Sequence, residues 1–402
     1  MVNIIALTLV GLTAMAGGVN AAGFRLSEQD AKANGMGNAF TAVADNASAV
    51  WYNPAAIGDL EGRTALSLGT VMVDPAMKHK YAGGSDSIKD MIHVPPYFYA
   101  AHKLNEKWGL GFGFNLPYGL STEWEKTSRT ASVATLSDIK AFNYNLNGSY
   151  KVNEELSVAV GADYVALDAT LNKMLAGKEL ELEGSGNGWG WNAAAMYKVN
   201  DKWKLGANYR SSVKVLVNDA TAKWNTFSNS ASTKITLPDT FQLGAAYEAN
   251  SRWLVSAGVD YTDWTTYRKV AIRSGTITQI TTLFYGAGNA TNTSTDTKDW
   301  KSVWAFRAGT RYKYSDKIAF TLGAFYDKNP VTEKYFETRV PDSDRIAGSI
   351  GGEYKLTEDM RLDLSYTVMR FDERSIDSGN NSIDGKYATT AQLPAIGIGY
   401  KF

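Results

Sequence analysis

The chain has 402 residues, and its 41 Lys and Arg residues balance 41 Asp and Glu residues, so the formal net charge is zero. This balance removes the electrostatic reason to expect a nucleic-acid partner or a polybasic membrane anchor. Cysteine is absent and only three histidines occur, which excludes disulfide scaffolds, thiol nucleophiles and cysteine-based metal sites. No cofactor or metal is therefore expected.

Residues 1–21 are predicted to be an export signal. The run Ile4–Leu12 is apolar and has about the length of a signal core, and Val19-Asn20-Ala21 resembles a cleavage site. A spanning helix needs about 20 apolar residues, and the pair Gly17-Gly18 together with Asn20 cuts this run short. No Lys or Arg precedes the run, so the true translation start stays open. An exported chain without cysteine fits the bacterial envelope.

Residues 22–62 are predicted to form a compact hatch domain with short helices and irregular structure. The segment is rich in Ala, Asn and Gly, and Ser27 is expected to cap a short helix through Asp30 that ends at Gly35. A disordered extension is the alternative. The segment's apolar side chains exceed what a disordered tail usually carries; they are Phe24, Phe40, Val43, Val50, Trp51, Ile57 and Leu60. A plug inside a larger fold is the preferred interpretation.

Six short turns organise residues 63–402. Each has a basic or acidic residue, a polar turn containing Asn, Asp, Glu or Ser, and then a large apolar residue, which is typical of a tight hairpin. They are residues 103–108, 151–156, 198–203, 248–253, 313–318 and 355–360. Six hairpins supply twelve strands, and strands at about 63–74 and 386–402 make fourteen.

Strict alternation of large apolar with small or polar residues follows the turns. Trp108, Leu110 and Phe112 share one face of a strand, for example, and the intervening glycines share the other. A soluble sandwich also alternates, but its strands are usually about 5–6 residues long. The longer runs, the aromatic residues at both ends and the alternation of short with long connections indicate an all-β, fourteen-stranded antiparallel transmembrane barrel, plugged by the hatch.

This architecture implies a place in the cell and a set of partners. The predicted location is the bacterial outer membrane, where the barrel contacts outer-membrane lipid as a multi-pass protein and as an expected monomer. The final strand ends with the aromatic residue Phe402, a common feature of outer-membrane barrels for insertion, so the barrel-assembly machinery is an expected partner.

One predicted strand contains a break. Asn115-Leu116-Pro117-Tyr118-Gly119 lies inside the strand 108–123. Proline cannot donate to the hydrogen-bond ladder and the glycine favours a bend, so pairing is expected to fail locally. In a bilayer such a break is tolerated only where protein or water satisfies the backbone. An ordinary bulge is the alternative to a lateral gap.

Several motifs resemble the FadL family of outer-membrane transporters for long-chain fatty acids and other hydrophobic compounds. They span the mature chain in order and are Ala22–Glu28, Asn34–Ala39, Asn53-Pro54-Ala55, Gly188–Ala193, Tyr209-Arg210-Ser211, Leu237-Pro238-Asp239 and Val340–Arg345. The resemblance implies a fourteen-stranded barrel with an N-terminal hatch. It also implies passive uptake of long-chain fatty acids or similar molecules, captured at the outer face and released laterally through a gap in the wall.

The same resemblance implies roles for individual residues. Two basic residues that face a bound carboxylate fall on Lys173 and Lys301. Asn53-Pro54-Ala55 falls at the end of the hatch that faces the kinked strand, on one side of the exit. Phe24 is expected to lie against the ligand tunnel. The loop after Lys173 is shorter than in relatives with a capture groove, so that groove is an open question, as are substrate chain length and any receptor or adhesin role of the outer loops.

Other functions remain to be weighed. An aromatic-hydrocarbon channel would share this fold. A general porin needs a wide lumen without a hatch, which residues 22–62 oppose. An esterase needs a nucleophile beside a histidine, and His79, His93 and His102 lie near no recognisable Ser motif. The chain is therefore predicted not to be an enzyme.

Overall fold

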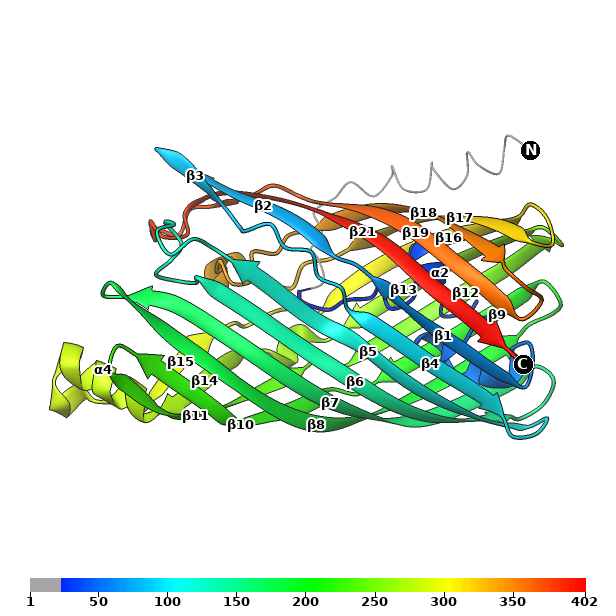
Figure 1. The fold of residues 1–402 in the computed structure, drawn as a ribbon, viewed down its shortest axis with the longest axis horizontal. Helices are drawn as coiled ribbons and strands as arrows, with labels where there is room; N and C mark the ends of the chain where they lie inside the picture. The colour runs from blue at the N-terminus through cyan, green and yellow to red at the C-terminus, as the bar shows by residue number, and fades with distance from the viewer. Residues whose placement is uncertain (1–22) are drawn as a thin grey trace.

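The structure is a computed structural model that describes residues 23–402, so the predicted export signal lies outside the described residues. Antiparallel strands form one sheet, and its last strand, β21 (Gly385–Lys401), pairs with its first, β1 (Thr64–Val71), which closes the wall. Figure 1 shows the strands running obliquely around a common axis. The predicted fourteen-stranded antiparallel barrel is confirmed.

Several of the fourteen wall positions consist of two strand segments separated by a bend. In chain order the positions are β1 with β2 (Asp74–Tyr81), β4 (Pro96–Lys103), β5 (Trp108–Glu123), β6 (Leu136–Lys151), β7 (Leu156–Leu175), β8 (Lys178–Lys198), β9 (Trp203–Arg210) with β10 (Val213–Trp224), β11 (Phe227–Leu237) with β12 (Thr240–Asn250), β13 (Trp253–Thr262) with β14 (Lys269–Ser274), β15 (Thr293–Thr297) with β16 (Val303–Lys313), β17 (Ile318–Asp327), β18 (Arg345–Lys355), β19 (Met360–Phe371) with β20 (Arg374–Ile376), and β21. The short strand β3 (Gly84–Ser87) pairs with β2.

All six predicted turns connect neighbouring wall strands. In each turn the side chain of the third residue accepts hydrogen bonds from the backbone N–H groups two and three residues later, which is the local chemistry that Asn, Ser and Thr bring to turns. The accepting residues are Asn105, Asn153, Asn200, Asn250, Ser315 and Thr357.

Large apolar side chains face outward, as predicted, and aromatic pairs form two belts around the wall. The belt near the six turns contains the pairs Trp108–Tyr150, Trp203–Tyr247 and Trp253–Tyr312. The other contains Tyr164–Trp189, Trp191–Tyr209 and Tyr261–Trp304. On β13, Trp253 and Tyr261 belong to one belt each, and about 27 Å of strand separates them at about 3.4 Å per residue. With the tilt of the strands, this interval suits the apolar band of about 25 Å of an outer-membrane barrel.

The hatch contains α2 (Ala31–Gly35), α3 (Ala49–Tyr52) and the 3-10 helix η1 (Pro54–Asp59), and almost all its side chains are buried. The predicted cap at Ser27 is wrong. The helix begins at Ala31, and the Asp30 carboxylate accepts a hydrogen bond from the Ala33 N–H at 3.0 Å. Ser27 Oγ instead donates to Glu28 at 2.9 Å. The predicted end at Gly35 is confirmed.

The other helices lie in the long connections at the opposite end from the six turns (Figure 1). They are α4 (Gly275–Tyr285) and the 3-10 helices η2 (Trp264–Thr266), η3 (Ala287–Asn289) and η4 (Glu333–Tyr335). Among residues 23–402, no helix is long and apolar enough to cross a bilayer.

Part of the hatch backbone lies directly on glycines of the wall. A Cβ atom on Gly206 would lie 2.2 Å from the Thr41 carbonyl oxygen, and one on Gly309 would lie 2.3 Å from the Met36 carbonyl oxygen. A Cβ atom on Gly323 would lie 2.0 Å from the backbone nitrogen of Gly37. Only a residue without a side chain permits this approach. We call Gly206, Gly309 and Gly323 the glycine seam.

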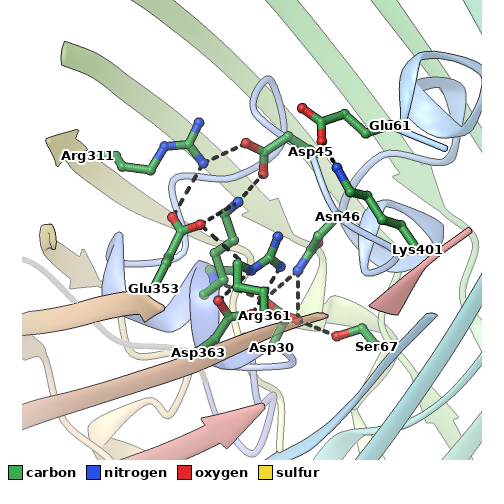
Figure 2. A network of polar contacts seen from close by, with 12 residues as sticks. Asp30, Asp45, Asn46, Glu61, Ser67, Arg311, Glu353, Arg361, Asp363 and Lys401 are labelled. Atoms are coloured by element: carbon green, nitrogen blue, oxygen red, sulfur yellow. Dashed lines mark hydrogen bonds and ion pairs between the residues drawn. The ribbon is translucent and has the colours of Figure 1, made fainter. Parts of the chain in front are cut away.

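A partly buried ionic network also ties the hatch to the wall (Figure 2). Lys32 of α2 contacts the carboxylates of Asp45 at 2.9 Å and of Glu353, on β18, at 3.0 Å. Arg311 of β16 also contacts Asp45, at 2.6 Å, and Arg361 of β19 lies 3.7 Å from Glu353. Opposite charges thus alternate between hatch and wall, which satisfies groups that are costly to bury alone.

The inward face of the wall changes character along the barrel axis. Around the hatch it is polar and includes Asn147, Asn192, Asn208 and Arg210, whose side chains are buried. Beyond the hatch the buried side chains are apolar and form one cluster with Phe24; among them are Leu167, Val213, Val215, Val217, Ile235 and Leu237. An apolar interior therefore begins where the hatch ends.

Candidate functional site

Strand β5 loses its neighbour on one side at the predicted break. Its pairing with β4 ends at Phe114, which lies opposite Phe98. On the other side, the register with β6 shifts between Asn115 and Tyr118. Pro117 lacks an N–H and so cannot continue either ladder. We call residues 115–119 the wall gap.

The first described residues of the hatch occupy the edge that β4 leaves open. The Leu26 N–H donates to the Pro117 carbonyl oxygen at 2.8 Å, and the Gly119 N–H donates to the Phe24 carbonyl oxygen at 3.0 Å. Arg25 and Tyr118 form an antiparallel bridge between these two bonds. The backbone groups freed at the wall gap are therefore satisfied by protein, as a break at membrane depth requires.

A second hatch side chain ties the same region together. Gln29 donates from Nε2 to the Leu116 carbonyl oxygen at 3.0 Å. Its Oε1 accepts a hydrogen bond from the Asn115 side chain at 3.1 Å. Gln29 thus satisfies both the backbone and a side chain of the wall gap, and the sequence pattern did not single it out.

Phe24 lies at the centre of an aromatic cage. Its ring is 4.7 Å from that of Trp264, 5.6 Å from Tyr267, 5.8 Å from Trp300 and 6.1 Å from Tyr118, measured between centroids. Trp264 belongs to η2, Tyr267 follows it directly, Trp300 lies in the connection between β15 and β16, and Tyr118 lies in the wall gap. The cage leaves 3% of Phe24 exposed. Sequence reasoning selected Phe24 but missed Trp264, Tyr267 and Trp300.

An apolar cavity of about 490 Å³ lies beside the cage and reaches across the wall at the gap. It falls in the range of about 300–1,000 Å³ that is usual for small-molecule sites. Its lining includes Phe24, Leu26 and Arg345 from the lumen, Leu116, Gly119 and Leu120 from β5, and Ile92, Val94 and Pro95 from the linker before β4. Lys140 and Phe142 line it as well, and the alternation of β6 points them outward.

Charged side chains beside the cavity form a ladder across the lumen. Arg25 of the hatch contacts Asp260 at 3.1 Å, and Arg307 contacts the same carboxylate at 3.0 Å. Arg307 also reaches Asp327 at 3.2 Å, and Arg345 contacts Asp327 at 2.8 Å. We call these five residues the arginine ladder. Three guanidinium groups share two carboxylates within it.

Asp342 holds the start of the hatch from the opposite side. Its carboxylate accepts hydrogen bonds from the Gly23 N–H at 2.8 Å and from the Ser343 N–H at 3.0 Å. Burial raises the pKa of Asp342 to about 7. The attachment of Gly23 therefore involves a carboxyl group that titrates near neutral pH.

The two lysines selected for a carboxylate lie in different surroundings. Lys173 lies partly buried near the outer end of β7, opposite Leu180 of β8. Lys301 is exposed, and its N–H donates to the Pro330 carbonyl oxygen at 3.0 Å. Neither residue lines the apolar cavity. Their carboxylate role stays a prediction.

Two buried cations near these lysines were not selected from the sequence. Lys298 contacts Asp296 at 2.7 Å and also contacts Glu337. Arg339 donates from Nη1 to the Ser137 hydroxyl at 3.2 Å and to backbone carbonyl oxygens of β6 and β7. Both come from irregular connections, where strand periodicity gives no signal.

The motif Asn53-Pro54-Ala55 lies at the start of η1, away from the cavity lining. The Asn53 side chain caps η1 by accepting from the Ala55 N–H at 3.2 Å. It also donates to the carbonyl oxygens of Thr41 and, on β8, of Ala195, at 2.9 and 3.0 Å. The motif therefore anchors the hatch to the wall, and its role at an exit stays a prediction.

Comparison with solved structures agrees with this architecture. A FadL homologue from Pseudomonas aeruginosa superposes with a TM-score of 0.81 at 17% identity, covering 95% of this chain and 100% of that one. The toluene transporter TodX from Pseudomonas putida superposes with a TM-score of 0.72 at 17% identity, covering 94% and 99%. At these identities the similarity establishes the fold.

Comparison of sequences identifies relatives of similar length. A long-chain fatty acid transport protein of Salmonella typhi is 26% identical over 406 residues, covering 89% of each chain. Outer membrane protein P1 of Haemophilus influenzae is 25% identical over 418 residues, covering 88% of this chain and 87% of the relative. The family model described as outer membrane protein transport protein (OMPP1/FadL/TodX) matches residues 12–402. The chain therefore belongs to this family of transport proteins and is a multi-pass β-barrel of the bacterial outer membrane.

Proposed function

We propose that the protein carries long-chain fatty acids or similarly hydrophobic molecules passively across the outer membrane and releases them sideways at the wall gap. The observation that carries this proposal is the apolar cavity, because its lining combines lumenal residues such as Phe24 with the outward-facing Phe142. The names of the Salmonella and Escherichia coli relatives, long-chain fatty acid transport proteins, support the substrate class.

The seating of the hatch argues against a route through the end of the barrel that carries the six turns. The glycine seam brings wall and hatch backbones together, and Lys32 and Asp45 are bound to charged residues of two wall strands, β18 and β16. Moving this body would expose buried charges and break several contacts together. A sideways path needs only the segment around Phe24 to move.

A ligand can open that path only if it binds the open arrangement better than the closed one. Phe24 places an apolar ring where an apolar ligand would find its most favourable surface, so the two compete for the aromatic cage. Once Phe24 leaves, the bonds from Leu26 to Pro117 and from Gly119 to Phe24 lose their alignment. The wall gap is then uncovered.

Further assignments belong to the same proposal. Lys173 and Lys301 attract the carboxylate at the outer side, and Asn53-Pro54-Ala55 forms part of the hatch beside the exit. Residues 22–62 act as a hatch domain and residues 63–402 as the barrel domain, following removal of residues 1–21. The barrel works as a monomer and inserts through the assembly machinery, which recognises the strand ending at Phe402.

The decisive experiment seals the wall. Replacing residues 115–119 with alternating strand-forming residues should restore ladder pairing, so uptake of a radiolabelled long-chain acid by cells should fall to background. The purified barrel should still show heat-dependent electrophoretic mobility and still bind the acid. An equivalent replacement at residues 364–368 of β19 is the matched control and should leave uptake intact. Normal uptake by the sealed variant would rule out lateral release.

An aromatic-hydrocarbon channel is the second candidate. The observation in its favour is the cage of four rings around Phe24, since edge-to-face and tilted aromatic contacts of this kind suit an aromatic ligand. Competition between toluene and a long-chain acid for the purified barrel separates the two candidates. A general porin is disfavoured by the buried hatch. A very low single-channel conductance would support this conclusion, because a plugged lumen passes little ion current.

A further inference from the structure

The apolar cavity is lined by seven titratable or charged side chains. From the hatch come Arg25 and Glu28, from the linker before β4 His93, from β6 Asp138 and Lys140, and from the connection before β18 and its first residue Asp342 and Arg345. A carboxylate that enters the cavity must find a partner among these groups, because an unpaired anion in apolar surroundings is costly.

Each of the cations already has a carboxylate partner. Arg25 and Arg345 are bound within the arginine ladder, to Asp260 and Asp327. Lys140 contacts Asp138 at 2.6 Å at the outer mouth of the cavity. Burial lowers the pKa of His93, so its ring is neutral near neutral pH.

Glu28 completes the charge balance of the arginine ladder. The ladder has three guanidinium groups and two carboxylates, and the charge of Glu28 acts on Arg307 and Arg345. Among the described residues, Glu28 has no cation within ion-pair distance; its carboxylate accepts from the hydroxyl of Ser27 at 2.9 Å. The negative charge of Glu28 therefore compensates the third guanidinium group. Without Glu28, a ligand carboxylate could provide that compensation.

Asp342 adds a further acid rather than a cation. Its carboxylate is held by backbone N–H groups, and no cation of the described chain lies within ion-pair distance of it. A second carboxylate in the cavity would consequently meet Glu28, and above about pH 7 also the ionised Asp342, with no free positive charge between them. Like charges at such a site disfavour ionisation of the newcomer.

We propose that the cavity accepts its hydrophobic ligand only in uncharged form and that Glu28 sets this selectivity. The proposal rests on the proposed function, since it concerns the same route to the wall gap. A fatty acid takes up a proton from water at the outer side before it enters, and returns the proton to water after it leaves. Alcohols and hydrocarbons of similar length need no such step.

Decanoic acid and 1-decanol are the probes for the test, because they differ in the head group alone. Binding is measured by calorimetry from about pH 5 to about pH 9 on the full-length mature barrel in amphipol, with Lys173 and Lys301 replaced by Ala so that the outer carboxylate contacts are removed. Because only the protonated fraction binds, affinity for the acid should fall about tenfold for each pH unit above the pKa of the free acid. Affinity for the alcohol should stay constant across this range. Equal affinity for both probes at the highest pH would overturn the proposal.

The variant Glu28→Gln keeps the shape of the side chain and removes its charge. The arginine ladder then carries one uncompensated positive charge, so binding of decanoate at high pH should rise by about tenfold or more, the ratio that corresponds to about one pKa unit. Alcohol binding should not change, which also reports correct folding. Glu61→Gln is the control, because Glu61 lies outside the cavity and pairs with Lys401. No gain in Glu28→Gln would show that Glu28 does not set the selectivity.

Arg25 offers the remaining route to anion binding, since it could leave Asp260 and bind the ligand while Arg307 remains on Asp260. If that occurs, the unmodified protein will bind decanoate at high pH, and the single variant Arg25→Gln will lose decanoate binding but keep decanol binding. That result would overturn the proposal. If the proposal holds, Arg25→Gln affects both probes equally. Failure of both probes to bind any variant would count against the proposed function itself and is distinguishable from either result.

Discussion

The carbonyl oxygen of Phe24 accepts a hydrogen bond from the backbone N–H of Gly119 at 3.0 Å, so the residue that fills the aromatic cage also closes the wall. One peptide group therefore links the aromatic cage to the wall gap. In the proposed lateral route, movement of the Phe24 ring would open the gap through this link while the main body of the hatch stays in place.

Removal of the Phe24 ring tests the coupling. Phe24→Ala should loosen the segment around it, because truncation of a buried Phe typically costs about 3–5 kcal/mol. Hydrogen exchange at the N–H groups of Leu26 and Gly119 should become faster, while exchange in α2 stays slow. Phe284→Ala, at an exposed position of α4, is the control. An unchanged rate of hydrogen exchange at the Gly119 N–H would show that the aromatic cage and the wall gap are not coupled.

The glycine seam can be tested with a single methyl group. Gly323→Ala places a Cβ atom 2.0 Å from the Gly37 nitrogen, whereas Gly348→Ala on the adjacent strand meets nothing within 4 Å. Overpacking typically costs about 1–3 kcal/mol, so Gly323→Ala should displace the hatch and lower the temperature at which the barrel unfolds in a heat-mobility assay. Gly348→Ala should behave like the unmodified protein. If the two variants unfold at the same temperature, the hatch backbone does not press against the wall at Gly323.

Asp342 predicts a pH dependence. Because its pKa is raised from 3.8 to about 7, the folded state binds this proton more tightly than the unfolded state does. Its contribution to stability is therefore complete below about pH 4 and is lost as the pH rises to about 7, by up to about 4 kcal/mol. Thermal unfolding between these values should show the decline. Asp342→Asn should flatten it, and a decline that persists in the variant would point to other groups.

The role predicted for Lys173 and Lys301 can be tested by comparing a charged with an uncharged ligand. Replacing Lys173 and Lys301 with Ala should weaken binding of a long-chain acid more than tenfold, since charge-assisted contacts contribute about 1.5–3 kcal/mol each. Binding of the corresponding hydrocarbon should change little. Lys173→Ala alone should account for most of the effect, because Lys301 is exposed. An equal loss of affinity for the acid and the hydrocarbon would show that neither lysine binds the carboxylate and that both are solvated charges near the outer rim of the barrel.

The barrel could be predicted from the sequence because its signals are local. Asn105 and the five residues equivalent to it fix their turns through hydrogen bonds that reach only three residues along the chain. Pro117 likewise interrupts its ladder whatever lies nearby. Strand alternation then places the remaining side chains on one face or the other.

The rest of the site depends on contacts between distant segments. The cage joins Phe24 to Trp264 and Trp300, and no pattern within the sequence relates these positions. Lys298 is buried and Lys301 is exposed, and the sequence could not distinguish them because both lie in a connection without strand periodicity. The sequence places the cap of α2 at Ser27 because Ser and Asp are nearly equivalent as caps, whereas the carboxylate of Asp30 accepts the hydrogen bond from the Ala33 N–H.

The glycine seam also constrains the order of assembly. Wall segments from β9, β16 and β17 touch the hatch backbone at distances that leave no room for a side chain to slide past. A hatch threaded into a finished cylinder would have to pass those strands, so the wall must instead fold around it. If the hatch is the template for closure in this way, a barrel expressed without residues 22–62 should close slowly or into a different circumference.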